Sequence, residues 1–379
     1  MQLALVNGRI LTQTGIVDGK AVTIRDGRIT GVLDSADIPA DAVRRDLDGG
    51  LLVPGFIDTQ VNGGGGVLFN DSTTVEAIAA IGAAHRAYGT TGFLPTLISD
   101  DLDVVDAAMR AVEQAIEAGV PGVLGIHIEG PFLNVKRKGI HDSTKFRVLD
   151  DQAVALLSSL KRGKTLVTLA PETTTPDRVT RLAEAGVIVA AGHTNAAYGV
   201  VRKALDAGLT GFTHLFNAMS PLTSREPGVV GAALESQSAW CGIIVDGRHV
   251  DPTVLRIALR TRPLDRFMLV TDAMPTVGMV DKSFDLQGRH IRVIDGVCVD
   301  DNGTLAGSDL DMIGAVRNAV SMLGLSLEDA VSIASHAPAA FLGLACDRGA
   351  IAVDQAADLV LLDEDLSVRE TWIDGQTVS

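Results

Sequence analysis

The sequence predicts an α/β protein: a (β/α)8 TIM-like barrel with a small β-sandwich domain formed from both chain termini. Three observations support this fold class. The middle of the chain alternates short apolar runs with Ala-rich helical stretches, which is the pattern of a parallel sheet. Both ends of the chain are instead rich in strand-forming residues and tight turns. The length of 379 residues suits one large barrel and a small satellite.

Eight apolar runs in the middle of the chain are the candidate barrel strands. They cover residues 56–61, 92–97, 123–129, 166–170, 187–193, 211–216, 242–246 and 267–272. Helical segments separate them, for example residues 75–88 and 196–207. We expect the barrel to occupy residues 53–344, because eight strand–helix units need about 250 residues or more. An inserted hairpin near residues 274–308 is in a position to cover an active site.

The two ends of the chain are expected to pair into one β domain. The runs at residues 3–6 and 21–24 are each followed by a hairpin signal, Asn7-Gly8 and Asp26-Gly27. The C-terminal end repeats the pattern and closes with another Asp-Gly pair. The segments assigned to this domain are residues 1–52 and 345–379.

Charge and composition exclude several classes of partner. The formal net charge of −15 repels phosphate backbones and anionic lipid, so we expect neither nucleic acid nor membrane as a partner. No apolar run approaches the roughly 20 residues that cross a bilayer. The N-terminus lacks the features of a secretory signal, and the three cysteines suit neither a disulfide framework nor a thiolate metal site. A cytoplasmic location is expected.

The chemistry-bearing residues stand at the ends of the predicted strands. The third strand ends in His127 and Glu129, and the fifth, sixth and eighth lead to His193, His214 and Asp272. A single His at a strand end is most often structural. A closed barrel, however, brings all its strand ends to one rim, where one carboxylate and two imidazoles suit Zn²⁺ with a position left for water.

Among these residues, Glu129, His193 and His214 are the predicted metal ligands, and Asp272 is the predicted acid–base residue. His127 and Glu129 are two apart and point to the same side of their strand. Glu129 is assigned as the ligand because it lies nearer the turn, and His127 is left as a supporting or packing residue.

At these residues the sequence resembles the amidohydrolase superfamily and, within it, the N-acetylglucosamine-6-phosphate deacetylases. The resemblance covers essentially the whole chain. The segments that carry it are residues 54–58, 60–63, 127–134, 138–141, 169–172, 191–196, 213–219, 225–228, 246–250, 270–273 and 303–308.

The resemblance implies hydrolysis of the acetamide of N-acetyl-D-glucosamine 6-phosphate to D-glucosamine 6-phosphate and acetate. It supports the three ligands and Asp272 in their roles, and it implies that His141 contacts the sugar and polarises the acetamide carbonyl. It also implies a homodimer in which the neighbouring subunit helps to complete the phosphate site. The positions that it assigns to substrate binding are Ile140, His141, Asn217, Ala218, Arg225, Asp246, His249, Leu305, Ala306 and Gly307.

One departure from the wider superfamily affects the metal content. Many amidohydrolases end the first strand with His-x-His, which holds a second metal, whereas this chain has Gln60 and Asn62. Neutral amides are poor ligands for a transition metal. We therefore expect one divalent metal per subunit, Zn²⁺, with Gln60 and Asn62 as vestigial second-metal positions.

Other interpretations remain at this point. The same scaffold fits an N-acetylgalactosamine-6-phosphate deacetylase, or an amidohydrolase for D-amino acids or dipeptides. A non-catalytic barrel that binds a ligand is a more remote alternative. Individual residues also have plainer interpretations: Arg225 beside Glu226 fits a local ion pair, and His141 follows a basic run, residues 136–138, that fits a solvated loop.

Overall fold

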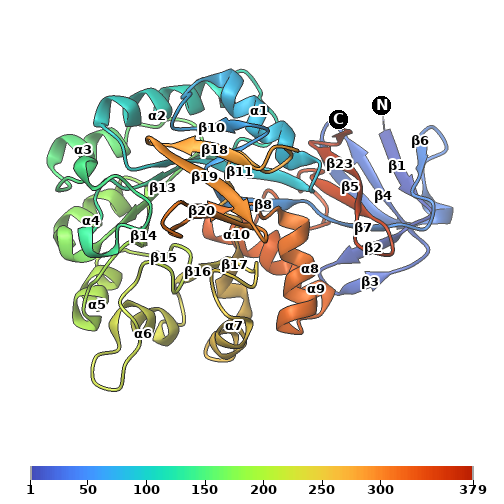
Figure 1. Ribbon diagram of the computed structural model, residues 1–379. Coiled ribbons are helices and arrows are strands. Elements are labelled where there is room, and N and C mark those ends of the chain that lie inside the picture. The colour runs from blue at the N-terminus through green and yellow to red at the C-terminus, as the bar shows by residue number, and fades with distance from the viewer. Residues whose placement is uncertain (1, 378–379) are drawn as a thin grey trace.

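The centre of the molecule is a sheet of eight parallel strands. The computed structural model describes residues 2–377, and its strands follow chain order around the barrel (Figure 1). The barrel strands are β8 (Phe56–Val61), β11 (Thr90–Ile98), β12 (Gly125–Glu129), β13 (Lys164–Leu169), β14 (Ile188–Ala191), β15 (Gly211–Phe212), β16 (Trp240–Ile243) and β17 (Phe267–Leu269). The expected barrel is confirmed.

The barrel closes between its first and last strands at the end that carries the predicted site. Val61 forms a parallel bridge with Ala273, beyond β17. The backbone amides of Asn62 and Gly63 both donate to the carbonyl of Ala273, at 2.9 and 3.0 Å. Asn62 is therefore held at the rim, close to the residue that follows Asp272.

Helices surround the barrel strands and bury their outer faces. Every residue of β8, β11 and β12 is buried, including polar residues such as Asp58 and His127 that face the barrel interior. The helices are α1 (Val75–Arg86), α2 (Leu102–Glu117), α3 (Asp151–Leu157), α4 (Pro176–Glu184), α5 (Tyr198–Asp206), α6 (Gly228–Glu235), α7 (Pro252–Leu259), α8 (Met312–Leu323), α9 (Leu327–Ala334) and α10 (His336–Phe341).

The helices show the patterning expected of this layer. In α2, Val105, Ala108, Met109 and Val112 are buried at spacings of three and four, so one stripe of the helix faces the barrel. Side chains cap several N-termini: that of Asp150, for example, accepts from the amide of Ala153 at the start of α3.

Two sheets form the β-sandwich beside the barrel, and the second of them combines strands from both chain ends (Figure 1). The first sheet has the order β5 (Arg28–Asp34), β4 (Lys20–Arg25), β1 (Gln2–Val6) and β6 (Val43–Asp46). The second has the order β24 (Gln376–Thr377), β23 (Val368–Ile373), β22 (Leu359–Leu362), β7 (Leu51–Pro54), β2 (Arg9–Thr12) and β3 (Gly15–Val17). Leu5 and Val22 from the first sheet pack with Ile10, Leu359 and Trp372 from the second, which gives the sandwich its own apolar core.

One hairpin signal does not produce a hairpin. The pair Asn7-Gly8 turns the chain, with Asn7 at φ 59°, but β1 and β2 lie in different sheets. Both edges of β1 are occupied, by β4 and β6, so β2 has no free edge of β1 to join. The pair Asp26-Gly27, in contrast, connects β4 and β5 with φ values of 50° and 77°, as expected of this turn type.

The insertion after β17 is larger than the predicted hairpin. It forms a four-stranded antiparallel sheet of β18 (Ser283–Leu286), β19 (Arg289–Ile294), β20 (Val297–Asp300) and β21 (Leu305–Ser308), which lies across the barrel in Figure 1. Its apolar side chains, among them Leu286 and Ile291, pack on Ile98 at the end of β11 and on Ile140 in the loop that follows β12. A short hairpin, β9 (Gly63–Gly64) with β10 (Val67–Leu68), follows β8.

No helix within residues 2–377 combines the length and the apolar composition that a bilayer crossing requires.

Candidate active site

Glu129, His193 and His214 form a buried cluster at the barrel rim. Oε1 of Glu129 lies 3.2 Å from Nε2 of His193 and 2.9 Å from Nε2 of His214. The two Nε2 atoms are 3.1 Å apart. Each residue comes from the end of a different strand, β12, β14 or β15, so only the closed barrel brings them together.

The backbone at this rim adopts an uncommon conformation. His193, His214 and Asp272 have φ values of 47°, 30° and 53°, in the left-handed region that side-chain-bearing residues rarely occupy. Such residues cost about 1–3 kcal/mol each and persist where surrounding contacts hold them. Three of them among four chemistry-bearing residues indicate a functional site.

The three side chains fit a divalent metal ion. Zn²⁺ ligands at about 2.0–2.2 Å in a tetrahedral site lie roughly 3.3 Å from one another, close to the separations between these atoms. Nδ1 of His193 donates to the carbonyl of Arg137 at 2.8 Å, so a neutral His193 offers only a lone pair at Nε2. A lone pair facing a carboxylate oxygen requires a cation between them. The cluster is a candidate metal site of one carboxylate and two imidazoles.

Charge also favours an ionised Glu129. Burial alone would raise the pKa of this carboxyl, but the adjacent imidazoles of His193 and His214 outweigh burial and hold the pKa well below its ordinary value. A carboxylate at this position is the form that binds a metal.

Asp272 lies beside this cluster and is held by two amides. Its Oδ1 accepts from Nε2 of Gln60 at 3.0 Å and from Nδ2 of Asn62 at 2.7 Å. Gln60 also donates to Oε2 of Glu129 at 3.1 Å. Burial, and then the charge of Glu129, raises the pKa of Asp272 to about 6, which is a useful value for a group that takes up and releases a proton near neutral pH.

His141 is buried and faces the same cavity rather than lying in a solvated loop. Its Nδ1 accepts from the backbone amide of Ser99 at 3.3 Å and lies 2.8 Å from the Ser99 hydroxyl. Burial, followed by the nearby His193, lowers the pKa of His141 well below its ordinary value, so the ring is neutral. A neutral ring that accepts at Nδ1 carries its hydrogen at Nε2, which makes it a hydrogen-bond donor.

A cavity of about 140 Å³ joins these groups, and most of the predicted substrate residues line it. The polar part of its lining consists of Glu129, His193, His214, Asp272, His141 and Asn62. The other predicted residues in the lining are Ile140, Asn217, Ala218, His249, Leu305 and Gly307. The inserted sheet supplies Leu305 and Gly307, so the insertion covers the site.

Three predicted substrate residues lie outside this lining. The side chain of Ala306 packs into the apolar core under the inserted sheet, between its two cavity-lining neighbours. Asp246 lies behind His249, whose Nδ1 donates to Asp246 Oδ2 at 2.6 Å. Arg225 stands on an exposed loop.

No ion pair joins Arg225 to Glu226 among the described residues. Glu226 instead accepts from the backbone amides of Tyr198 and Gly228. No Lys or Arg lines the described part of this cavity, so Arg225 lies outside it.

Sequence reasoning missed several residues that shape the site. Ser99, directly after β11, holds His141, and Glu172, shortly after β13, holds the segment next to His193. Ile98 and Met274 line the cavity. Glu172 lies in the segment 169–172 that carries the family resemblance, but it was given no role. The others have no signal beyond their place at or just past a strand end, which many unrelated residues share.

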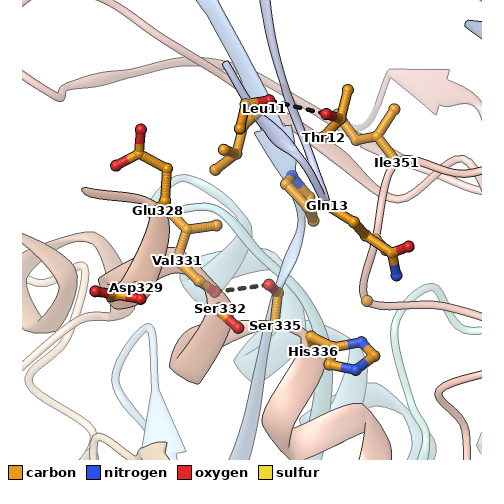
Figure 2. A pocket seen from close by; sticks show the side chains of 14 residues that line it. Leu11, Thr12, Gln13, Glu328, Asp329, Val331, Ser332, Ser335, His336 and Ile351 are labelled. Carbon is orange, nitrogen blue, oxygen red and sulfur yellow. Dashed lines mark hydrogen bonds between the residues drawn. The ribbon is translucent and has the colours of Figure 1, made fainter. Parts of the chain in front are cut away.

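A second, larger cavity of about 340 Å³ lies between the sandwich and the barrel (Figure 2). Gln13 from the β2–β3 turn and His336 at the start of α10 border it, and the Ser335 hydroxyl donates to the carbonyl of Val331 at 2.6 Å. None of the predicted site residues lines this cavity.

Comparison with protein families agrees with the site geometry. The amidohydrolase family model matches residues 51–378, and the NagA composite domain model matches residues 3–52. The chain belongs to the amidohydrolase family.

Named relatives of this amidohydrolase cover nearly its whole length. It is 45% identical to an N-acetylgalactosamine-6-phosphate deacetylase of Shewanella sp. (strain ANA-3), over 97% of this chain and 94% of the relative. It is 34% identical to an N-acetylglucosamine-6-phosphate deacetylase of Haemophilus influenzae, over 99% of both chains. The crystal structure of N-acetylglucosamine-6-phosphate deacetylase from Pasteurella multocida is similar over 100% of both chains, with a TM-score of 0.96 and 35% identity.

Proposed function

We propose that this amidohydrolase removes the acetyl group of N-acetyl-D-glucosamine 6-phosphate, giving D-glucosamine 6-phosphate and acetate. The observation that carries the proposal is the placement of Asp272 and His141 around the cluster of Glu129, His193 and His214 in one cavity. The names of the relatives supply the substrate, and the cavity supplies the groups that amide hydrolysis needs. A purely ligand-binding barrel has no need of the acid–base carboxylate.

One divalent ion per subunit, Zn²⁺, is proposed as the cofactor, with Glu129, His193 and His214 as its ligands. When bound, it supplies a water of lowered pKa and polarises the substrate carbonyl. Gln60 and Asn62 donate to Asp272 instead of offering imidazole nitrogens, which supports a single-metal site.

Asp272 is proposed as the acid–base residue. With a pKa of about 6, its carboxyl is ionised at neutral pH. Both amide donors bind Oδ1, which leaves Oδ2 free to take the proton of the attacking water and pass it to the departing sugar nitrogen. His141 is proposed to donate from Nε2 to the acetamide oxygen as negative charge develops there.

The phosphate is proposed to bind at the side of the cavity formed by Asn217, Ala218 and His249. The ring of His249 is held in place there by Asp246, whose Oδ2 lies 2.6 Å from Nδ1 of His249. The exposed Arg225 supports a homodimer in which the phosphate site is completed between two subunits. A cytoplasmic location completes the proposal.

A second candidate substrate is the galacto epimer, N-acetyl-D-galactosamine 6-phosphate. The 45% identical relative is named for this substrate, and its identity to the chain exceeds that of the relative named for the gluco epimer. The two sugars differ only in the configuration of one hydroxyl, so the same catalytic groups serve either.

The test is acetate release by metal-analysed protein from both phosphorylated epimers and from unphosphorylated N-acetylglucosamine. We expect turnover that depends on the phosphate, with the larger kcat/KM for the gluco epimer. A larger kcat/KM for the galacto epimer would make that sugar the substrate. No acetate from any of the three, with metal bound, would refute deacetylation of these sugars.

A further inference from the structure

Glu172 joins two loops at the carboxyl end of the barrel. It follows β13, and its carboxylate accepts three hydrogen bonds from the loops that follow β12 and β14. Nδ2 of Asn134 donates to Oε1 at 2.8 Å, and the backbone amide of Asn195 donates to the same oxygen at 2.6 Å. The Thr194 hydroxyl donates to Oε2 at 2.5 Å. Among residues 2–377, no Lys or Arg forms an ion pair with Glu172, so these three donors are its partners.

The loop that follows β12 holds His193 directly. The backbone amide of Asn134 donates to the carbonyl of His193 at 3.0 Å. Oδ1 of Asn134 accepts from the amide of Lys136 at 2.9 Å and thereby shapes the turn that carries Arg137. The carbonyl of Arg137 accepts from Nδ1 of His193 at 2.8 Å. Glu172 is thus connected to both the backbone and the ring of His193 through Asn134.

The hydrogen bond to Arg137 selects the form of His193 that binds a metal. A neutral imidazole carries one hydrogen, and its other nitrogen has the lone pair. With the hydrogen at Nδ1, the lone pair is at Nε2, which faces Glu129 and His214. If the Arg137 carbonyl moves away, the ring gains access to the opposite form, in which Nε2 carries hydrogen and cannot bind an ion.

The backbone of His193 needs the same support. Its φ of 47° is unfavourable for a residue with a side chain and persists only where neighbours hold it. The next residue, Thr194, is fixed on both sides, because its amide donates to the carbonyl of Ala218 at 3.0 Å and its hydroxyl donates to Glu172.

We infer that Glu172 is a positioning residue for the metal centre, whose carboxylate holds the two loops so that His193 presents an unprotonated Nε2. The inference rests on the metal centre of the proposed function, but not on the identity of the substrate. Partners that orient a metal-binding His typically change metal affinity by about 10–100-fold when they are removed.

Two variants distinguish the loss of the hydrogen-bond acceptors of Glu172 from the loss of its negative charge alone. Glu172→Ala removes all three acceptor contacts. Glu172→Gln keeps an oxygen that accepts from the amides of Asn134 and Asn195. The Thr194 hydroxyl already accepts from the backbone amide of Ala196 at 3.1 Å, and it can also accept from the new side-chain amide. Asn134→Ala breaks the link between Glu172 and the Arg137 turn from the other side. Asp150→Ala is the control. Asp150 stands at the far end of the loop that follows β12, where it accepts from the amide of Ala153 and from Arg147, and it forms no hydrogen bond with Glu172, Asn134 or His193.

Two measurements test the inference on the full-length protein. The first is the Zn²⁺ dissociation constant, obtained by competition with a chelator. The second is the protonation pattern of the His193 ring in the metal-free, ¹⁵N-labelled protein, read from two-bond ¹H–¹⁵N NMR spectra and assigned by comparison with His193→Gln. Thermal melting of each variant checks that it folds.

The expected result is a His193 ring protonated at Nδ1 in the parent protein. Glu172→Ala and Asn134→Ala should weaken Zn²⁺ binding about 10–100-fold and mix the two ring forms. Glu172→Gln should stay within about threefold of the parent, as should Asp150→Ala. A parent-like affinity and ring form in folded Glu172→Ala would overturn the inference; if that variant does not fold, the same result for Asn134→Ala would overturn it.

Failure of the proposed function looks different. If the parent protein binds Zn²⁺ but releases no acetate, the proposed substrate is refuted. The role of Glu172 is then still decided by the ratio of the Zn²⁺ dissociation constants of the variants and the parent.

Discussion

Asn62 donates from Nδ2 to Oδ1 of Asp272 at 2.7 Å, across the point where the barrel closes. The same oxygen accepts from Gln60. Gln60 and Asn62, the expected vestigial second-metal positions, therefore both donate to the carboxylate proposed as the acid–base residue. The contact between Asn62 and Asp272 therefore bears on three properties of the site: how many metal ions are expected to bind, the pKa of Asp272, and the proposed catalysis.

Replacement of Asp272 by Asn should leave the metal bound and remove most turnover. Asn cannot take up the water proton, and acid–base catalysis contributes about 10²–10⁴-fold, so kcat should fall by roughly 10³. Initial rates of acetate release, together with the zinc content per subunit, check this. A variant with a kcat near that of the parent would exclude Asp272 as the acid–base residue.

Replacement of Asn62 by Ala should move the acidic limb of the pH–rate profile to higher pH. The active form of Asp272 is the carboxylate, and the hydrogen bond from Asn62 opposes the burial and the Glu129 charge that raise its pKa to about 6. Loss of that donor raises the pKa further, so activity is lost at a higher pH as the solution is acidified. Asn318→Ala is the control, because Asn318 donates to the carbonyl of Val245, away from Asp272, and should leave the limb in place. An unshifted limb in Asn62→Ala contradicts the assignment.

Zinc titration of metal-free protein should saturate at one equivalent per subunit. Gln60 and Asn62 present amide hydrogens to Asp272, and these repel a cation from the second position. The double variant Gln60→His/Asn62→His should bind a second equivalent, because imidazole nitrogen is a good zinc ligand. Isothermal titration measures both. Two tight equivalents in the parent protein would show that the amides do not exclude the second ion.

Replacement of His141 by Gln should lower kcat/KM by about 10²–10³, which is the effect of removing one donor to a developing oxyanion. Ser99→Ala should cost far less, because the backbone amide of residue 99 still donates to Nδ1 and preserves the ring form. Steady-state kinetics on both variants, with zinc content as the check, tests the pair. Equal losses would show that the Ser99 hydroxyl, rather than the His141 donor, matters most.

Asp58 should make folding stability decrease as pH rises. Burial raises its pKa in the folded protein to about 7, above its ordinary value near 4, so the folded state holds the proton more tightly. The resulting stabilisation is full below pH 4 and is lost as pH rises through 7. Between pH 5 and 8, Asp58→Asn should gain about 2–3 kcal/mol relative to the parent. Urea unfolding of metal-free protein at both pH values measures this gain; a pH-independent difference would contradict it.

The sequence alone determined the type and order of the main elements. Strands such as β8 and β11 are buried throughout, and each lies between helical segments, so the barrel follows from repeated strand–helix units. The chemistry-bearing residues could also be located, because a barrel places every strand end at one rim. Short strands were less accurate: the run at residues 211–216 contains only the two-residue β15, since the chain leaves the sheet before His214.

The tertiary structure decided everything that depends on contacts between distant segments. Asn7-Gly8 was a sound turn signal, but the free edges of β1 were taken by strands from elsewhere in the chain. The ring forms of His141 and His193 depend on Ser99 and on the Arg137 carbonyl, 42 and 56 residues away in sequence. Residue type predicts that a His can bind a metal or donate a proton. Which nitrogen is free to do so is set by partners that only folding brings within hydrogen-bonding distance.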